Sequence, residues 1–509
     1  MGQQLMHTGN IRTMKNFFLK HSEKIVIISV FLALALLLGQ HWGMTLSNSD
    51  DPWIVRATMA EIFNTASVQG RFWLIPINLM AQAPYHLGSW EAANAIKISV
   101  NGLVFILFLV FCTLLTNRWV GVLIGLIWLA FIDVSPGYYS PFHGYLMMFN
   151  LQFAALFGSF IWYLKILDSD TPKRIVIGPY ILYAFSLLAY EPMLFYAAVY
   201  PSLMLFRYFQ VNASKLRMRQ WWDLIVQFGK SNYLLALTVA AYFLTYFAYR
   251  RFQPTSGRGI DTDGNVLDIV KTIYRFSLNG FHFQPKAFTN YMEGFSSPAT
   301  LALAVVYALV IALACLVVIP RVHGPLHPSK LYGKAALAML FFFVFCPNLL
   351  HGFVQGYRQW AAEDPHYVGN YFSSFPLAIT VTLGVLYLVG GRRAIQEKIL
   401  FGMLLILIAC SACDNYIRWG NLADANRRDS ALWWQAIVEL KRSELNPSAT
   451  TIICGKNAPE KVSGDDRYWS LYLSEALDKK VEFKSKALDT VNCNKTLEFN
   501  RYRFTQPAL

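Results

Sequence analysis

The sequence predicts an all-α polytopic membrane protein of about eleven transmembrane helices, followed by a small α/β domain outside the cytoplasm. Hydrophobic residues make up 55% of the 509 residues and charged residues only 15%, whereas soluble domains average about 25% charged residues. Apolar runs long enough to cross a bilayer recur along the chain. Short clusters of Lys and Arg separate these runs, and the C-terminal tail is polar.

The positive charge of the chain is interpreted as a topology signal. The formal net charge is +14, which is also typical of nucleic-acid-binding proteins. The basic residues, however, lie in short clusters between apolar runs rather than on one face of a polar domain. We therefore expect membrane lipids as partners and no nucleic acid.

Residues 1–24 are expected to form a cytoplasmic N-terminus. The first apolar run, Ile25 to Gly43, is too long for the core of a signal peptide and lacks a small-residue cleavage site. It is predicted to remain in the protein as a signal anchor.

Residues 25–414 form the predicted transmembrane domain. A membrane helix needs about 20 largely apolar residues, because unpaired backbone groups are costly in hydrocarbon. The run from Ile175 to Phe206 is long enough for two helices. Tyr190-Glu191-Pro192 is the predicted turn between them, because proline and the residue before it disfavour a continuing helix. The predicted spans lie near 25–43, 94–116, 119–135, 145–165, 175–190, 192–207, 233–249, 299–319, 334–354, 373–390 and 398–414.

The distribution of Lys and Arg predicts the orientation. With the N-terminus inside, the basic clusters fall in cytoplasmic loops and the short outer loops hold few positive charges. An unsplit run over 175–206 would invert every later loop and place the cluster around Arg217 outside. The split is therefore favoured, and the C-terminus is predicted to lie outside the cytoplasm.

Three predicted outer segments are long: residues 44–93, residues 250–298 and the tail 415–509. In the first, Phe72 to Leu87 is apolar but too short and too proline-broken to span, which is typical of a helix in the membrane interface. The tail alternates helical and strand patterns, which favours a small α/β domain. Its predicted elements are a helix over Ser430–Lys441, a strand over Thr450–Cys454, a helix over Tyr468–Leu477 and a strand over Val481–Lys484.

Two of the seven cysteines, Cys454 and Cys493, lie in the polar tail, and the other five lie in or beside apolar runs. Thiols in apolar runs behave as small hydrophobic groups. If the tail is outside the cytoplasm, Cys454 and Cys493 can form a disulfide. Two free thiols are the equally open alternative.

The sharpest local motif is Ser49-Asp50-Asp51-Pro52-Trp53, just after the first span. Two adjacent carboxylates at a membrane surface are costly beside each other, so the pKa of one of them can be raised, which suits a general base or a metal ligand. The alternative is structural: Ser49 or an Asp caps a helix over Trp53 to Ala66 that begins with Pro52. Spacing alone favours the cap.

Glu191 is the second candidate. An acidic residue between two membrane spans indicates a functional site, because burying it near lipid costs a few kcal/mol. A turn that simply reaches water is the alternative, and the sequence leaves both open.

The predicted outer loop between the ninth and tenth spans combines cationic and aromatic residues. Such groups suit a lipid-borne phosphate and a sugar ring stacked on an aromatic face. A membrane-interface belt explains many of the aromatic residues as well or better. It does not explain Arg358, since topology does not need an outside arginine. The candidates are Tyr357, Arg358, His366 and Tyr371 in this loop, with His143 in the short outer loop after the third span.

Together these features resemble the GT-C superfamily of membrane glycosyltransferases. The shared layout is an inside N-terminus, a long first outer loop that opens with a paired acidic motif, an interfacial helix, many further spans and a small tail. Within the superfamily, SDDPW at 49–53 and SLLAYEP at 186–192 look most like the bacterial and phage O-antigen glucosyltransferases that change serotype. The likeness in layout covers nearly the whole chain, although the motifs are short.

The resemblance implies a glycosyltransferase of the bacterial inner membrane with a periplasmic C-terminus. The donor would be a polyprenyl-phosphate-linked sugar, and the acceptor would be a lipid-linked glycan or O-antigen or other cell-surface polysaccharide at the outer leaflet. Of the two aspartates, Asp51 is favoured over Asp50 as the base, with Glu191 as a further acidic group. Charge stabilisation of the leaving phosphate is assigned to Arg358, with His366 and Tyr371 as further ligands, and sugar or acceptor contact to Tyr190, His143 and Tyr357.

One departure from the family leaves the phosphate ligand open. Other members have an arginine-tyrosine pair close to the start of a late span, whereas this chain has Asn370-Tyr371 there and Arg358 well upstream. No metal site is assigned and no cofactor is expected with certainty, although the sequence leaves a divalent cation open.

Three other functions compete. A transporter would favour repeated halves and charges at mid-bilayer, and the sequence has neither. An O-antigen polymerase or ligase also works at the outer leaflet but relies on arginines in a late outer loop, whereas the distinctive motif here is acidic and early. A non-catalytic scaffold remains if the carboxylates are helix caps.

Overall fold

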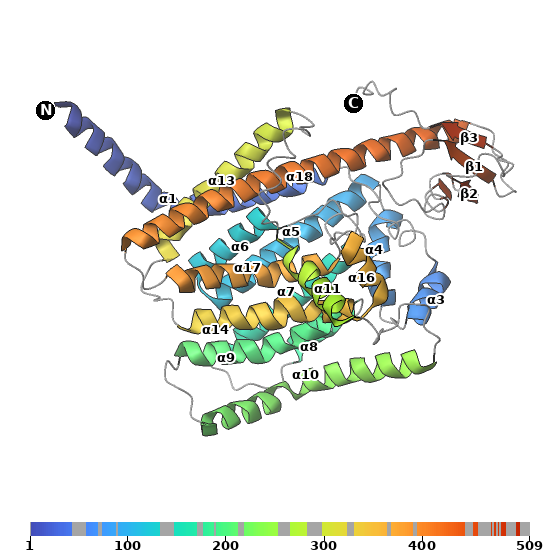
Figure 1. The fold of residues 1–509 in the computed structure, drawn as a ribbon, viewed down its shortest axis with the longest axis horizontal. Helices are drawn as coiled ribbons and strands as arrows, with labels where there is room; N and C mark the ends of the chain where they lie inside the picture. The colour runs from blue at the N-terminus through green and yellow to red at the C-terminus, as the bar shows by residue number, and fades with distance from the viewer. Residues whose placement is uncertain are drawn as a thin grey trace.

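The computed structural model is a bundle of long helices with a small sheet at one end (Figure 1). It describes residues 2–42, 58–69, 74–87, 90–132, 147–169, 177–187, 190–211, 218–252, 265–281, 298–322, 330–363, 368–389, 394–442, 451–456, 481–484 and 495–498, with single positions between 470 and 480.

The described elements follow one another along the chain with few strands, all of them near the C-terminus. The α-helices are α1 (Gly2–Gln40), α3 (Met59–Gln69), α4 (Leu74–Leu87), α5 (Trp90–Leu115), α6 (Arg118–Phe131), α7 (Met148–Leu167), α8 (Gly178–Ser186), α9 (Val199–Val211), α10 (Met218–Phe252), α11 (Val266–Leu278), α13 (Pro298–Val322), α14 (Lys330–Ala338), α15 (Leu349–Gly352), α16 (Gln355–Glu363), α17 (Val368–Val389) and α18 (Ala394–Arg442). Two 3-10 helices are η2 (Glu191–Ala198) and η4 (Cys346–Asn348), and η3 (Met339–Phe345) is a π-helix. The strands are β1 (Thr451–Lys456), β2 (Val481–Lys484) and β3 (Lys495–Glu498).

Within the described residues, seven helical segments are long and apolar enough to cross a membrane. They are His21–Gln40, Ala92–Leu115, Met148–Leu167, Pro298–Val322, Tyr332–Gly352, Gly369–Val389 and Ile395–Asn421, and Arg118–Phe131 and Asn232–Tyr246 are shorter apolar helices. The chain is therefore a multi-pass membrane protein. Each of the eleven predicted spans overlaps helical structure, but the number of crossings stays a prediction.

The predicted break in the run from Ile175 to Phe206 is confirmed. Helix α8 ends at Ser186, and the 3-10 segment η2 begins at Glu191. Tyr190 between them is extended, with φ −152° and ψ 122°. The predicted helix over 72–87 is also confirmed, as α4, while its place in the membrane interface stays a prediction.

The end of the chain differs from the prediction. The last predicted span and the predicted tail helix over Ser430–Lys441 form one helix, α18, of 49 residues. This segment contains no proline, and polar residues alone do not end a helix because its backbone hydrogen bonds are internal. The predicted start of the tail at residue 415 therefore lies inside a helix.

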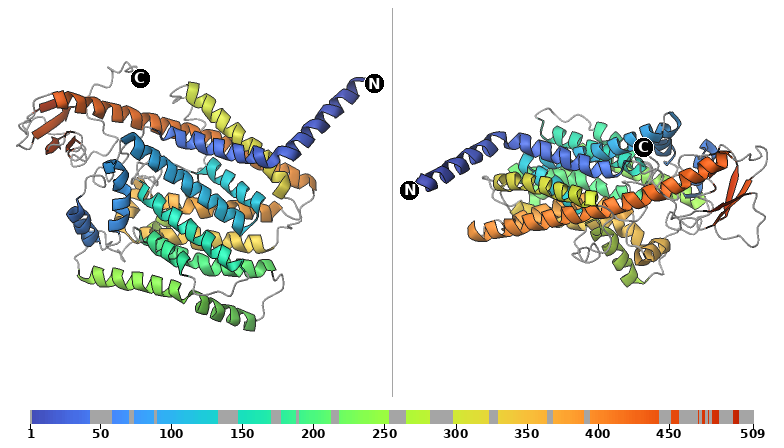
Figure 2. Two further views of the ribbon diagram at one scale, coloured as in Figure 1. Left: turned by 180° about the vertical axis from the view of Figure 1, so that it is seen from behind. Right: turned by 90° about the horizontal axis from the view of Figure 1, so that it is seen from above.

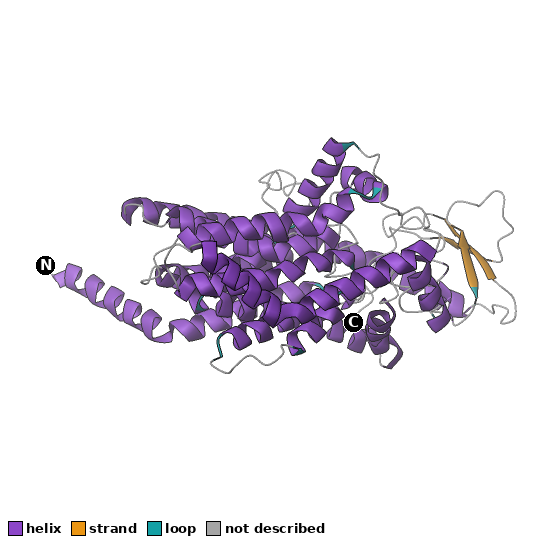
Figure 3. Cartoon of the chain, turned by 90° about the horizontal axis from the view of Figure 1, so that it is seen from below, coloured by secondary structure: helices purple, strands orange, loops and turns teal. Residues whose placement is uncertain are grey.

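The described part of the tail contains a three-stranded parallel sheet of order β2-β1-β3. Strands β1 and β2 confirm the two predicted strands, whereas β3 was not predicted. Figure 3 shows the sheet at one end of the molecule, with helices elsewhere. The helix predicted over Tyr468–Leu477 lies mostly outside the described residues.

Helices α1, α13 and α18 lie together along one edge of the bundle, and α10 lies along the opposite edge (Figures 1 and 2). Polar side chains hold the first edge to α6. The amide of Asn415 donates to the carbonyl of Ala130 at 2.7 Å, and the hydroxyl of Tyr307 donates to that of Leu129 at 2.8 Å. Helix α10 is attached through Asn232, which marks its kink and accepts a hydrogen bond from Tyr180 of α8.

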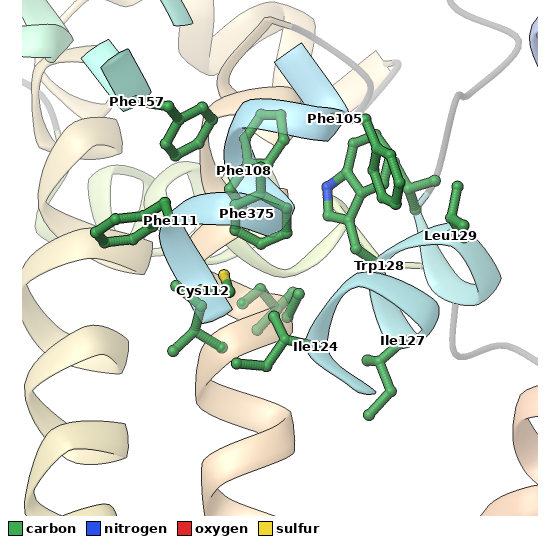
Figure 4. Close-up of a cluster of buried hydrophobic side chains, with 14 of the residues drawn as sticks. Phe105, Phe108, Phe111, Cys112, Ile124, Ile127, Trp128, Leu129, Phe157 and Phe375 are labelled. Carbon is green, nitrogen blue, oxygen red and sulfur yellow. The ribbon is translucent and has the colours of Figure 1, made fainter. Parts of the chain in front are cut away.

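The centre of the bundle is aromatic (Figure 4). Trp128 of α6 stacks on Phe375 of α17, with ring centroids 5.1 Å apart, and Phe108 of α5 packs edge-on against the same ring. The indole N–H of Trp128 donates to the hydroxyl of Ser374 at 3.1 Å. Lipid is as apolar as these rings, so close packing rather than burial from water holds such helices together.

Gly121 allows α5 and α6 to approach each other closely. A Cβ atom at Gly121 would lie 2.5 Å from the backbone nitrogen of Thr113, which cannot move aside as a side chain could. We expect Gly121→Ala to separate the two helices and to lower the apparent Tm of the detergent-solubilised protein. The free energy of unfolding should fall by about 1–3 kcal/mol. Gly384→Ala in α17 is the control, because nothing lies within 4 Å of a Cβ there. Equal melting curves for the two variants would contradict the close approach.

Candidate functional site

Buried polar side chains gather beside α16. Helix α16 lies toward the end of the bundle that is on the right in Figure 1, as do α4 and the sheet. The chain turns at this end between α8 and η2, and between η4 and α17. We name this group of polar residues the end cluster; it comprises Asn150, Tyr190, Glu191, Asn348, His351, Arg358 and Tyr371, which lie on or beside α7, η2, η4, α15, α16 and α17.

Glu191 is the first residue of η2 and is 9% exposed. Pro192 follows it and favours the start of a helix, because its ring fixes φ and its missing N–H is not needed there. Buried acidic residues among membrane helices are often functional, and the role of Glu191 stays a prediction.

Tyr190 links this turn to a distant part of the chain. Its hydroxyl lies 2.6 Å from Nε2 of His351 on α15, and the two residues are 3% and 1% exposed. The ring of Tyr190 also packs against Phe149 and Phe372, with centroids 5.4 Å and 5.3 Å away. The turn that carries Glu191 is thus held on a packed surface of three other helices.

Asn348 is the centre of the hydrogen bonds on the far side of His351. Its Oδ1 lies 2.9 Å from Nδ1 of His351, and its Nδ2 lies 2.7 Å from the hydroxyl of Ser373 and 3.0 Å from that of Ser277. The side chain is fully buried. One amide therefore connects α11, α15 and α17.

Helix α16 carries two of the predicted ligands. The ring of Tyr357 is 8% exposed and packs edge-on against His351 at 4.9 Å. The Arg358 guanidinium donates from Nη1 to the carbonyl of Gly352 at 3.0 Å. The side chain is partly exposed, and a guanidinium, with five N–H donors in a planar fork, is suited to binding a phosphate or carboxylate.

Tyr371 near the start of α17 is also fixed by a long-range contact. Its hydroxyl donates to Oδ1 of Asn150 on α7 at 2.7 Å, and both side chains are buried. Its ring packs edge-on against Phe153. The structure therefore places Tyr371 and Tyr190 in the end cluster, and Tyr357 packs against the cluster through His351.

Lys97 was missed by the sequence analysis. It lies within α5 and is only 1% exposed, although lysine is almost never fully buried unless it is paired. Asn101, one turn later, is 3% exposed. The available signal was a lysine inside a predicted span, which membrane helices rarely tolerate without a function.

Several predicted site residues lie outside the described residues: Asp50, Asp51, His143, His366 and Cys493. Their roles stay predictions. Cys454 on β1 is disulfide-bonded, and Cys112, Cys315, Cys346, Cys410 and Cys413 are free. The pairing of Cys454 with Cys493 is likewise a prediction.

In the described ranges, no group of three or more His, Cys, Asp or Glu residues is arranged to hold a metal ion. Hydrogen bonds join Tyr190 to His351, His351 to Asn348, and Tyr371 to Asn150 within the end cluster. Its chemistry in the described part of the chain is that of buried hydrogen bonds, one acid and one arginine.

No protein-family model matches this sequence. No curated protein matches it either.

Solved structures give weak likenesses over most of the chain. ArnT from Cupriavidus metallidurans, bound to undecaprenyl phosphate, is 14% identical with a TM-score of 0.36, over 91% of this chain and 86% of that one. The oligosaccharyltransferase AglB from Archaeoglobus fulgidus, in complex with an inhibitory peptide and a dolichol-phosphate, is 12% identical with a TM-score of 0.38, over 91% and 64%. With such low TM-scores, these structures do not support a conclusion about the function of this chain.

Gly369 makes room for the Asn348–His351 contact. A Cβ atom there would collide with Oδ1 of Asn348 and lie 3.2 Å from the His351 ring. We expect Gly369→Ala to break that hydrogen bond and lower the apparent Tm by the equivalent of about 1–3 kcal/mol. Gly356→Ala in α16, where a Cβ meets nothing within 4 Å, should melt like the parent. If Gly369→Ala is as stable as this control, the hydrogen bond between Asn348 and His351 does not depend on the lack of a side chain at residue 369.

Proposed function

We propose that this protein is a membrane glycosyltransferase that takes a sugar from a polyprenyl-phosphate donor. The acceptor in this proposal is a lipid-linked glycan, O-antigen or other cell-surface polysaccharide at the outer leaflet of a bacterial inner membrane. The observation that carries the proposal is the burial of Glu191 in the end cluster of a membrane helix bundle. The paired aspartates and the YEP turn, which resemble those of GT-C enzymes, support it.

The chemistry needs a base near the acceptor hydroxyl. In the proposed step the acceptor oxygen attacks the anomeric carbon, the bond from that carbon to the phosphate oxygen breaks, and the hydroxyl proton passes to a carboxylate. Asp51 is the proposed base, with Asp50 as the alternative. Glu191 is proposed as a second acidic group that orients the acceptor, because its turn is rigidly held.

The departing polyprenyl phosphate needs positive charge rather than a strong acid. Arg358 is the proposed ligand, because its guanidinium is oriented by one backbone carbonyl and partly exposed. Lys97 is a second proposed cation. Its ammonium group is buried near the start of α5, and a lysine ammonium is a common ligand for a phosphate.

The proposed orientation has the N-terminus in the cytoplasm and the C-terminal sheet in the periplasm. The end cluster then opens toward the outer leaflet, where a flipped donor lipid presents its headgroup. The Lys and Arg distribution supports this orientation, and an oxidising periplasm is compatible with the disulfide at Cys454.

Asp51→Asn tests the proposed base. In proteoliposomes that contain a polyprenyl-phosphate-linked radiolabelled sugar and a lipid-linked glycan, we expect this variant to lose about a hundredfold or more of the transfer rate, with unchanged membrane abundance. Asp268→Asn on α11, whose side chain is 54% exposed, is the control and should remain active. An active Asp51→Asn variant would remove Asp51 from the mechanism, and a parent that transfers no sugar from such donors would refute the proposed function.

Lys97→Met tests the second cation. Methionine keeps the length of the side chain and suits an apolar helix, so the loss should fall on donor use rather than folding. We expect kcat/KM for the donor to fall about ten- to a hundredfold, as for loss of a hydrogen bond to a charged group, and Arg358→Ala to act in the same direction. The matched control is Lys271→Met, since Lys271 is 55% exposed on α11. If kcat/KM for the donor is unchanged in Lys97→Met, the role of Lys97 is structural.

A further inference from the structure

A continuous chain of buried hydrogen bonds runs through the end cluster. It passes from the carbonyl of Val344 through Ser373, Asn348 and His351 to the hydroxyl of Tyr190. Ser373 and Asn348 are 0% exposed, and His351 and Tyr190 are nearly so. No water is needed to complete these bonds.

The direction of each bond follows from the number of hydrogens available. The hydroxyl of Ser373 donates its single hydrogen to the carbonyl of Val344 at 2.9 Å. It can therefore only accept from Asn348, which must present its NH₂ group to Ser373 and its carbonyl oxygen to His351. The orientation of the amide is thus decided by chemistry.

The same argument decides the tautomer of His351. The carbonyl oxygen of Asn348 only accepts, so Nδ1 of His351 must carry a hydrogen. In the neutral imidazole Nε2 then has a lone pair, and Tyr190 donates its hydroxyl hydrogen to it. Aromatic rings of Phe276 and Tyr357 pack edge-on against the imidazole and favour this neutral form over a buried charge.

Tyr190 is directly joined to Glu191. Its hydroxyl is anchored 161 residues away in sequence, on α15, while Pro192 restricts the backbone on the other side of Glu191. The contact therefore fixes the backbone that carries the acidic residue.

We propose that His351 is a positioning residue for sugar transfer. In a single tautomer selected by Asn348, it accepts the hydrogen bond from Tyr190 and thereby holds Glu191 in place for the acceptor. This role rests on the proposed function. It requires no contact between His351 and substrate.

Tyr190→Phe tests this role, with Tyr196→Phe as a matched control. Tyr196 lies on η2, which begins directly after Tyr190. It is 5% exposed, and its hydroxyl donates to the backbone carbonyl of Phe372 at 2.8 Å. Each variant loses one buried hydrogen bond, so we expect similar losses in apparent Tm. Only Tyr190→Phe should lower kcat, by about tenfold, with the donor KM unchanged, because only its hydroxyl positions Glu191.

The dependence on Glu191 provides the second readout. In a Glu191→Gln background, which should itself reduce transfer, Tyr190→Phe and His351→Gln should cause no further loss of kcat. The role would be overturned if Tyr190→Phe or His351→Gln lowered kcat as much in the Glu191→Gln background as in the parent. It would also be overturned if Tyr190→Phe and Tyr196→Phe lowered kcat equally. A parent without transferase activity would overturn both the proposed function and this role, whereas an active parent with a fully active Tyr190→Phe variant would overturn only the role.

The tautomer is tested without any activity assay. The chain has ten histidines, so the resonances of His351 in a ¹⁵N-histidine-labelled sample can be assigned by their loss in His351→Gln. We expect a neutral ring with its hydrogen on Nδ1. A hydrogen on Nε2 alone, or a charged ring at neutral pH, would overturn the hydrogen-bond chain.

Discussion

The structure depends on one constraint: a polar group inside a membrane bundle must find its partner within the protein, because lipid offers none. The contacts that join the helices obey it. The indole of Trp128 donates to Ser374, the hydroxyl of Tyr307 to the carbonyl of Leu129, and the amide of Asn415 to that of Ala130. Close packing of aromatic rings supplies the remaining cohesion, and polar side chains are concentrated where the helices end.

The same constraint explains why irregular helices meet at the end cluster. Segments η2 and η4 are 3-10 helices and η3 is a π-helix, and such segments leave backbone groups that a regular helix would satisfy. Their neighbours supply the partners: Ser373 donates to the carbonyl of Val344 in η3, and Tyr183 donates to that of Leu194 in η2. Irregular backbone inside a membrane protein is tolerated only where it is buried in protein or lines a water-filled cavity, and η2 begins with the buried Glu191.

Much of the fold could be predicted because its signals are local. Apolar runs marked the helices, Pro192 marked the break before η2, and short strand-like runs marked β1 and β2. The continuity of α18 was missed because a polar stretch was interpreted as an end, although a helix with internal backbone bonds needs no apolar surface to continue. Strand β3 has only one apolar residue, Leu497, and therefore lacks the strand pattern that β2 shows with Val481 and Phe483.

The sequence by itself indicated that the chain lies in a membrane and where its helices lie. It also indicated Glu191, Arg358 and Tyr371 as candidate residues. These signals can be found in the sequence because composition, proline and charge act over a few residues. Only the tertiary structure decided which of these meet. Tyr190 and His351 are 161 residues apart, and Asn150 and Tyr371 are 221 apart. Such contacts follow from how helices pack, which leaves no periodic pattern in the chain, and the burial of Lys97 follows from the same packing.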